Sequence, residues 1–375
     1  MNHGWEKKRL GDVCKINFGN RIVAKDTKPG PYYVYGGGGA TFTTMDYNRE
    51  NCMIVSRFAM SPECVRFVRG RFFLNDSGLS VNSIKDFLTQ EFIDKYLWAI
   101  QPKIYSLGRG AAQKNLNTKS FSELTIPLPA VNIQHKIVSE IDKLNELIEL
   151  KRNQLKDLDA FAQSLFYETF GDPIDNPKGW ELKKFKDILF KIGSGATPRG
   201  GKQSYQGGDI SLIRSLNIYN TYFKYDELAK INEEQAYELR NVKVQYNDVL
   251  LNITGASVAR CYIVPMDTLP ARVNQHVAIL RPNNEFIQSV FLHRLLVTSS
   301  LQNFLIGTAR GKSATREALP KATLEMIEII VPPIEVQNKF ASKIEAIEEQ
   351  KRLIESSIAD LETLLASRMD YWFND

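Results

Sequence analysis

Cationic side chains beside glycine and other small residues form the segments of this sequence with the clearest chemical meaning. Gly307–Ser313 is similar to a nucleotide phosphate loop, but it is one residue short between its two glycines. Gly195–Lys202 has Ala196 where the first glycine of such a loop stands, and Gln203 follows where Ser or Thr must bind magnesium. Both segments therefore fail as nucleotide sites. We interpret them as small-residue loops whose backbone N–H groups can approach a phosphate closely.

The sequence offers no set of residues for catalysis or for metal binding. Its four histidines are far apart, and its four cysteines form no CxxC pair. Val331-Pro332-Pro333-Ile334 lacks the amide or carboxylate of an adenine methyltransferase motif. We expect a non-catalytic chain without a cofactor or metal of its own. Scattered cysteines, a polar start and no run of about 18 apolar residues predict a cytoplasmic protein without a membrane span.

Positive charge is concentrated in two blocks of the chain. The net charge is +5, yet residues 1–130 carry 18 Lys and Arg against 11 Asp and Glu, and residues 171–332 carry 20 against 16. Residues 131–170 carry 5 against 7, and residues 333–375 carry 5 against 9. This alternation is typical of two polyanion-binding modules on solvated supports. Chance scatter of charge over a soluble surface is the alternative.

The chain is a tandem duplication. Gly4-Trp5-Glu6 recurs as Gly179-Trp180-Glu181, an offset of 175 residues. A second repeat, with an offset of 203, runs without a gap over residues 108–162 and includes Gln134, which matches Gln337. The change of offset places 28 additional residues in the middle of the second copy. Two homologous domains follow from this pattern.

Each copy ends in a predicted long helix. Asn132 is the expected N-cap of the first helix, and Gly171 with Pro173 should end it. Mostly apolar residues recur at steps of 4 and 3, the heptad spacing of a coiled coil, with Lys151 and Lys351 interrupting the seams at different places. At 38 residues and about 57 Å, the first helix exceeds an ordinary domain helix, although packing of each helix on its own domain is the alternative. The apolar seam residues are Ile137, Ile141, Leu144, Ile148, Leu155, Leu158, Phe340, Ile344, Ile347, Ile354, Ile358 and Leu361.

We predict an α+β protein with two mixed α/β domains separated by two long helices that form an intramolecular antiparallel coiled coil. The expected boundaries are 1–131, 132–172, 173–335 and 336–375. Predicted strands cover Asn51–Ser56, Arg71–Leu74, Asp248–Thr254, Arg260–Val264 and His276–Leu280, and predicted domain helices cover Glu91–Ile100 and Glu285–Val297.

Motifs of the second half carry a resemblance to a known family. They run in the order Gly193-Ser194-Gly195-Ala196-Thr197-Pro198, Thr254-Gly255-Ala256 and Asn274-Gln275-His276. Ile329-Ile330-Val331-Pro332-Pro333-x-Glu335-x-Gln337 then leads into the second long helix. This order resembles the target-recognition domains of type I restriction–modification specificity subunits, the HsdS family. The first copy departs from the pattern with Ala130 for a proline and Asn132 for the glutamate.

The resemblance implies how such a chain works. The two domains would each read half of a bipartite site in double-stranded DNA, and the helices would set the spacer and hold two methyltransferase subunits. Restriction and translocation subunits are further expected partners, and no membrane is. S-adenosylmethionine, ATP and magnesium are expected only in the partner subunits.

Basic residues in and near the small-residue loops are the candidates for DNA contact, with solvated surface charge as the alternative for each. Arg109 and Lys312 occupy equivalent positions of the two copies, which favours a shared task such as phosphate anchoring. A domain of a fused restriction–methylation enzyme and a coiled-coil adaptor that binds only protein are the rival functions. The candidates are Arg57, Arg69, Arg71, Arg109, Lys114, Arg199, Lys202, Arg214, Arg310, Lys312 and Arg316.

Overall fold

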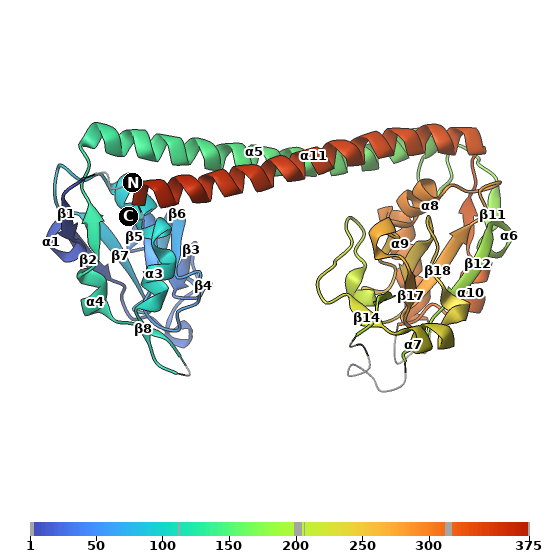
Figure 1. Cartoon of the computed structure of the whole chain (residues 1–375), viewed down its shortest axis with the longest axis horizontal. Coiled ribbons are helices and arrows are strands. Elements are labelled where there is room, and N and C mark those ends of the chain that lie inside the picture. The colour runs from blue at the N-terminus through green and yellow to red at the C-terminus, as the bar shows by residue number, and fades with distance from the viewer. Residues whose placement is uncertain (1–3, 112, 199–204, 206, 312–316, 374–375) are drawn as a thin grey trace. The chain divides into compact units, whose positions relative to one another are not determined.

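The computed structural model describes residues 4–111, 113–198, 205, 207–311 and 317–373. The chain divides into two compact units, Met1–Asn153 with Glu355–Asp375, and Gln154–Ile354. Two helices of 40 residues, α5 (Val131–Phe170) and α11 (Ile334–Phe373), each contribute to both units. The first unit therefore contains the N-terminal domain, the beginning of α5 and the end of α11. The second unit contains the C-terminal domain with the other halves (Figure 1).

The start of α5 differs from the sequence prediction. The helix already begins at Val131, and the backbone N–H groups of Ile133 and Gln134 both donate to the carbonyl of Ala130, at 2.8 and 3.0 Å. Asn132 therefore lies inside the first turn, and its prediction as N-cap was wrong. The predicted end is confirmed, because Gly171 has φ of +79° and donates its N–H to Tyr167 O at 2.8 Å.

A buried glutamine fixes the start of each long helix. The Gln134 amide nitrogen donates to the carbonyls of Phe87 and Pro129 at 2.7 and 2.8 Å, and its oxygen accepts from Thr89 N at 2.9 Å. Its side chain is fully buried and fully bonded, which ties the helix to the turn before α2 (Gln90–Ala99). The second copy repeats this geometry, with Gln337 bonded to Phe286 O, Pro332 O and Gln288 N at 2.9, 2.7 and 3.0 Å.

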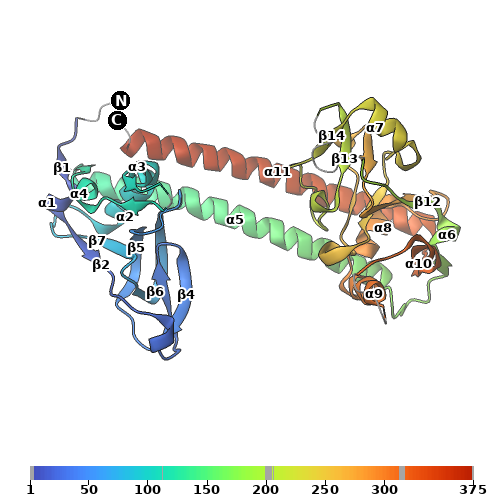
Figure 2. The ribbon, with the colours of Figure 1, turned by 90° about the horizontal axis from the view of Figure 1, so that it is seen from below.

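The domain of the first unit is built on a six-stranded sheet with the order β2-β7-β5-β6-β3-β4. Figure 2 shows β2 and β4 at its opposite edges. The predicted helix at Glu91–Ile100 and the predicted strands are confirmed to within a few residues, although Arg71–Leu74 is only the end of a longer strand. The elements are β1 (Lys7–Arg9), α1 (Leu10–Val13), β2 (Cys14–Phe18), β3 (Tyr32–Gly36), β4 (Gly39–Thr44), β5 (Arg49–Ser56), β6 (Val65–Leu74), β7 (Gly78–Ser83), α2 (Gln90–Ala99), α3 (Gln101–Ser106), β8 (Gly108–Arg109), β9 (Asn115–Leu116), α4 (Thr118–Ser122) and β10 (Thr125–Pro127).

The described residues of the second unit's domain form a four-stranded sheet of order β12-β18-β15-β16, a three-stranded sheet of order β14-β13-β17 and a two-stranded sheet of β11 and β19. Helix α8 begins at Ser289, four residues later than predicted, because Gln288 caps it by accepting from Phe291 N at 2.9 Å. The elements are β11 (Leu182–Lys184), α6 (Phe185–Ile188), β12 (Leu189–Ser194), β13 (Ile210–Ile213), β14 (Ala229–Ile231), α7 (Glu233–Glu238), the 3-10 helix η4 (Arg240–Val242), β15 (Val249–Asn252), β16 (Cys261–Ile263), β17 (Ala271–Val273), β18 (Val277–Pro282), α8 (Ser289–Leu296), α9 (Ser299–Arg310), α10 (Lys321–Met326) and β19 (Glu328–Ile330).

The two domains share one topology, although their strands are grouped into different sheets. The order β2-β7-β5-β6 corresponds to β12-β18-β15-β16. In the first unit the end of the long strand β6 also pairs in parallel with β3, and in the second unit the separate strand β17 pairs in parallel with β13. The segment Val264–Pro270 stands between β16 and β17 and divides the one long strand into two. This segment accounts for part of the additional length of the second copy.

The seam residues of α5 and α11 line the cores of the units. In the first unit Ile137, Ile141 and Leu144 of α5 share a core with Leu365 and Met369 of α11. In the second unit Phe166 and Phe170 of α5 share a core with Phe340, Ile344 and Ile347 of α11. Ile148 is also buried, and the half-buried seam residues are Leu155, Leu158, Ile354, Ile358 and Leu361.

Ion pairs join the two helices within each unit. Arg152 pairs with Glu362 at 2.7 Å and Arg368 with Glu140 in the first unit, and Lys351 pairs with Asp159 at 2.7 Å in the second. Residue numbers rise along α5 as they fall along α11, so the helices are antiparallel in each unit. Hydrogen bonding to Arg368 lowers the pKa of Glu140 below its ordinary value. Lys351, predicted to interrupt the seam, is thus buried with its charge paired.

Candidate nucleic-acid interface

An asparagine turn stands at the same place in both domains. Asn75 follows β6 and Asn274 follows β17, and each side-chain oxygen accepts the N–H two residues later, from Ser77 at 3.0 Å and from His276 at 3.1 Å. This side-chain bond mimics a backbone turn and is the reason asparagine suits the position. The turns present Asp76 and Gln275, respectively, at their tips.

The chain that leaves the central strand lies against each turn. After β5, Arg57 N donates to Ser77 O at 2.8 Å, and after β15, Ile253 N donates to His276 O at 2.9 Å. These bonds make Arg57 and Ile253 structurally equivalent, although the sequence showed no repeat in this region. Two segments distant in sequence therefore form one recognition tip in each unit, which we define as residues 57–60 with 75–77, and residues 253–256 with 274–276.

The tip of the second unit carries a chain of polar side chains. Thr197 donates to the Gln275 side-chain oxygen, the Gln275 amide donates to His276 Nε2 at 3.0 Å, and His276 Nδ1 lies 2.5 Å from Thr254 Oγ1. With Nε2 as acceptor, the imidazole proton lies on Nδ1 and is donated to Thr254. Thr197 and Gln275 are exposed, so this hydrogen-bonded chain reaches the surface.

A glycine is required to bring Thr197 to this place. A Cβ on Gly195 would lie 1.6 Å from the carbonyl oxygen of Val273, so only glycine permits the approach of the two backbones. Gly195 N donates to Asn274 O at 3.1 Å. The three motifs singled out in the sequence therefore meet at one tip.

The tip of the first unit has different chemistry on the equivalent backbone. The Arg57 guanidinium lies between two aromatic rings, 4.6 Å from the centre of Phe18 and 4.7 Å from that of Phe58. Its Nη1 donates to Asp76 O at 3.2 Å. Phe18 and Phe58 are 46% and 37% exposed, so the cation and its two aromatic neighbours lie at the surface.

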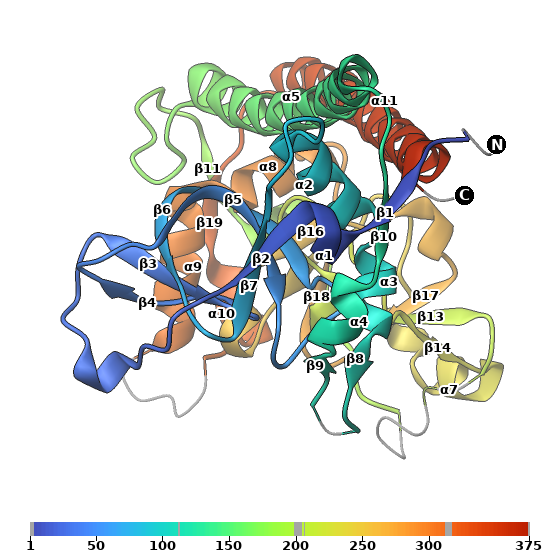
Figure 3. The same ribbon diagram turned by 90° about the vertical axis from the view of Figure 1, so that its left-hand side faces the viewer.

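The hairpin β8–β9 adds two predicted cations beside this tip. Arg109 is exposed on β8, and the Lys114 ammonium lies 4.0 Å above the ring of Tyr105. The hairpin is tied to the tip, because Met60 N donates to Lys114 O at 2.9 Å and Leu116 N donates to Arg57 O at 2.8 Å. In Figures 1 and 3 it lies at the end of the first unit that is remote from α5.

Two further predicted cations lie beside the tip of the second unit. Arg214 follows β13, where Ile213 O accepts from Asn274 N at 3.1 Å. Its guanidinium lies 5.5 Å from the ring centre of Tyr205 and donates to Glu227 O, while its buried Nε has no hydrogen-bond partner among the described residues. Arg310, at the end of α9, pairs with Glu317 at 2.9 Å.

The remaining candidates are not part of these tips. Arg71 pairs with Glu50 at 3.3 Å, and this bond raises the pKa of the arginine. Arg69 lines a cavity of about 550 Å³ with Trp98 of α2 and Asp142 of α5. Arg199, Lys202, Lys312 and Arg316 lie outside the described residues.

Sequence reasoning missed the neutral residues of the tips. Phe18, Phe58, Thr254, Gln275 and His276 were not selected because the search favoured cations. The sequence motifs that carried the family resemblance include three of these residues, at Thr254-Gly255 and Asn274–His276. They were used to identify the family and not to select site residues.

The described residues hold neither a candidate metal site nor a membrane-spanning helix. No group of three or more His, Cys, Asp and Glu side chains in that part of the chain is placed to hold a metal ion. Likewise, none of the helices described has the length and apolarity needed to cross a membrane.

Curated relatives are type I restriction enzyme specificity subunits. The MjaIX subunit of Methanocaldococcus jannaschii is 27% identical over 64% of this chain and 58% of its own length. The EcoBI subunit of Escherichia coli is 24% identical over 62% of this chain and 53% of its own length. These matches span little more than half of either relative. The MjaVIII subunit of M. jannaschii is 24% identical over 92% of this chain and 86% of its own length.

A solved structure has the same fold over nearly the whole chain. The S subunit of a type I restriction–modification system from M. genitalium matches with a TM-score of 0.59 and 16% identity, covering 99% of this chain and 96% of the other. The family model described as the type I restriction modification DNA specificity domain matches residues 2–160 and again residues 177–363. With two copies of that domain over most of its length, the chain belongs to the type I restriction–modification specificity family.

Proposed function

We propose that this chain is the DNA-recognition subunit of a type I restriction–modification complex and that each unit reads one half of a bipartite site. The observation that carries the proposal is the pair of recognition tips. Equivalent backbone hydrogen bonds build them, but one presents Arg57 between two aromatic rings and the other presents Gln275, His276 and two threonines. A shared scaffold with different surface chemistry suits two readers of different half-sites.

The side chains at the tips have the donors and acceptors that base edges require. A guanidinium held in one plane matches the two acceptors of guanine in the major groove. The Gln275 amide has a donor and an acceptor, the pattern that reads adenine. We assign Arg57 and Gln275 as base-reading residues of the first and second half-sites. Asp76, at the position equivalent to Gln275, can only accept hydrogen bonds when ionised, which makes the tips differ further.

Exposed cations around the tips are assigned to the phosphate backbone. Arg109 and Lys114 are close to the first tip, and Arg310 is close to the second through Glu317, whose carbonyl accepts from Gly255 N at 3.0 Å. Phosphate contacts orient a protein on the duplex but do not carry sequence information. Lys312, equivalent to Arg109, is assigned the same task.

We also propose that α5 and α11 form one continuous antiparallel coiled coil that acts as a spacer and docks two methyltransferase subunits. The shared cores and the ion pairs within each unit support the pairing. Two major-groove readers on one face of a duplex are separated by about 34 Å, one helical turn, or a multiple of it. A paired coil is stiff enough to set such a spacing, unlike a glycine linker.

In this proposal the chain itself is not catalytic. Methyl transfer, cleavage and translocation, with their S-adenosylmethionine, ATP and magnesium, belong to partner subunits that act with it in the cytoplasm. The buried thiols of the four cysteines have pKa values raised by burial, as expected for cysteines that serve packing.

Methylation mapping tests the function directly. The chain is co-expressed with its neighbouring methyltransferase gene, and methylated adenines are mapped genome-wide. We expect one motif with two specified halves and an unspecified spacer. Replacing residues 173–335 with the matching domain of a relative should change one half only. A chimera that altered both halves or neither would exclude modular reading, and absence of any methylated motif would count against the function itself.

A further inference from the structure

A cavity lined by lysines runs along the outer edge of the second domain. It has a volume of about 600 Å³ and lies between the edge strand β12, the 3-10 helix η4 and α10. Lys186, Lys191 and Lys321 line it, together with one acidic residue, Glu325. Glu325 pairs only loosely with Lys321, at 3.5 Å with the lysine 64% exposed, so the cavity keeps an excess of positive charge.

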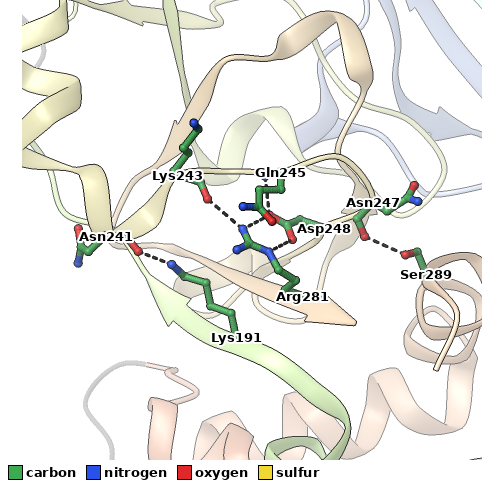
Figure 4. A network of polar contacts seen from close by, with 8 residues as sticks. All are labelled: Lys191, Asn241, Lys243, Gln245, Asn247, Asp248, Arg281 and Ser289. Carbon is green, nitrogen blue, oxygen red and sulfur yellow. Dashed lines mark hydrogen bonds and ion pairs between the residues drawn. The ribbon is translucent and has the colours of Figure 1, made fainter. Parts of the chain in front are cut away.

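Local bonds fix Lys191 and balance the charge behind it. Lys191 donates to the carbonyl of Asn241, which ties β12 to η4 (Figure 4). Behind it, Arg281 donates to both oxygens of the buried Asp248 at 2.8 Å, so the charge of that guanidinium is offset in part by its own partner. Burial, followed by the nearby Arg281, lowers the pKa of Lys191 below its ordinary value. A bound anion would offset the repulsion that acts on this ammonium.

The equivalent positions of the first domain hold only one of the three lysines. Strand pairing matches Lys191 with Lys15, because β12 has a bulge before Lys191, which pairs with Arg281 of β18 as Lys15 pairs with Asn82 of β7. The repeat offsets match Lys186 with Gly11 and Lys321 with Thr118. Space differs as well, because a Cβ on Gly11 would lie only 3.2 Å from Ser122 Cβ where α1 approaches α4. The set of three lysines is thus a property of the second domain, and the first domain keeps one of its positions in Lys15.

The cavity adjoins the recognition tip of the second unit. Ser194, the last residue of β12, lines it, and the chain continues through Gly195 to Thr197, the first member of the polar chain at the tip. Lys191 precedes Ser194 by about 10 Å of extended strand. A duplex read at the tip could therefore continue along β12, where lysines serve as point charges for phosphate. Phe190, 72% exposed beside them, offers an apolar surface to a sugar.

We propose that the β12 cavity, lined by Lys186, Lys191 and Lys321, binds a backbone phosphate of the DNA that flanks the second half-site. This assignment rests on the proposed DNA-recognition function and adds an asymmetry to it: the second unit holds the duplex beyond its half-site with three lysines, and the first unit has only Lys15 at the matching positions. The same oxyanion chemistry would also fit free phosphate, which the test below distinguishes.

The test uses K186Q/K321Q, which removes two exposed charges and leaves Lys191 and its bond to η4 in place. Binding of the complex of this chain with its methyltransferase to specific and non-specific duplexes is measured over a range of salt concentrations. We expect the log–log salt slope to become shallower by roughly one to two units, with an unchanged methylated motif. Ethylation of a phosphate outside the second half-site should interfere with binding of the wild-type complex but not of the variant.

The matched control is K15Q/K119Q, which removes two exposed lysines from β2 and α4 of the first domain, where Lys15 is the counterpart of Lys191 and Lys119 follows Thr118, the counterpart of Lys321. It should leave the slope nearly unchanged. Equal effects of the two variants would overturn the proposal in favour of diffuse surface charge. An unchanged slope with loss of inorganic phosphate binding would identify a small-anion site, and loss of the methyltransferase from the complex would identify a protein contact. A wild-type complex that binds no DNA would instead refute the underlying function.

Discussion

The recognition tips of the two units differ in how their key side chains are held. In the first unit, Arg57 is positioned by two aromatic rings and one carbonyl. In the second unit, Gln275 is positioned by hydrogen bonds from Thr197 and to His276. Aromatic packing leaves most of the guanidinium donors for a ligand, whereas the hydrogen-bonded chain already uses part of the amide. In the proposed function, the second tip would therefore exchange internal hydrogen bonds for bonds to DNA, and the first would not.

Apart from the tips, the two units are alike in structure. Both have the four-strand order of the larger sheet, the asparagine turn and the buried glutamine at the helix start. This duplicated protein thus keeps the positions whose bonds are buried and changes the exposed positions of its tips.

A charged side chain placed in the helix seam should have the largest effect, and it should act in both units. Leu144 in the first unit and Ile347 in the second are 9% and 6% exposed. Replacing either with Asp buries a carboxylate without a partner and should lower the free energy of unfolding by several kcal/mol, with loss of the methyltransferase. Chemical denaturation and co-purification measure both effects. A folded, fully assembled L144D/I347D double variant would rule out the proposed coil.

The buried glutamines should be equally important in both units. Q134L and Q337L each leave two carbonyls and one N–H without their partner, and we expect each to cost roughly 2–4 kcal/mol. Thermal denaturation of the two variants under one condition makes the comparison. Exposed Asn132→Ala, which alters the residue wrongly predicted to cap the helix, is the control and should cost less than about 0.5 kcal/mol. If only one of the two substitutions strongly lowered the free energy of unfolding, the shared hydrogen-bond geometry would not stabilise both units equally.

Substitutions at the tips should separate the half-sites. R57A should relax base preference in one half of the methylated motif, and Q275A in the other, each reducing discrimination by about 1–3 kcal/mol. Methylation mapping of both variants provides the measurement, and R57K keeps the charge while removing the planar fork. If R57K restored the motif, Arg57 would be a phosphate contact and not a base reader.

The smallest effect is expected from the phosphate anchors. R109A and K312A should each weaken specific and non-specific binding alike and reduce the salt slope by about one unit, without changing the methylated motif. Salt titrations of the assembled complex measure this. A relaxed motif with an unaltered slope would reassign these residues to base reading, and unaltered affinity would leave them as surface charges.

The sequence revealed the parts of the duplication where register and side chains are both kept. Gln134 and Gln337 match because their buried bonds tolerate little change. The equivalence of Arg57 and Ile253 was not visible in the sequence, since the inserted residues shift the register and the two side chains differ in chemistry. Only backbone hydrogen bonds reveal that equivalence. Cations were likewise easy to select by type, but the bonds that engage Arg71 with Glu50 and Arg310 with Glu317 depend on strand pairing and loop closure.

Each unit contains a part of both long helices, and this arrangement has a consequence for biosynthesis. The first unit needs Glu355–Asp375, which the ribosome makes only after the entire second unit, Gln154–Ile354. At common elongation rates this delay is roughly 10 to 40 s. During that time Ile137, Ile141 and Leu144 lack their partners on α11, so the N-terminal domain waits with an apolar stripe exposed. The usual order of vectorial folding is reversed, and chaperone binding during translation should be concentrated on the beginning of α5.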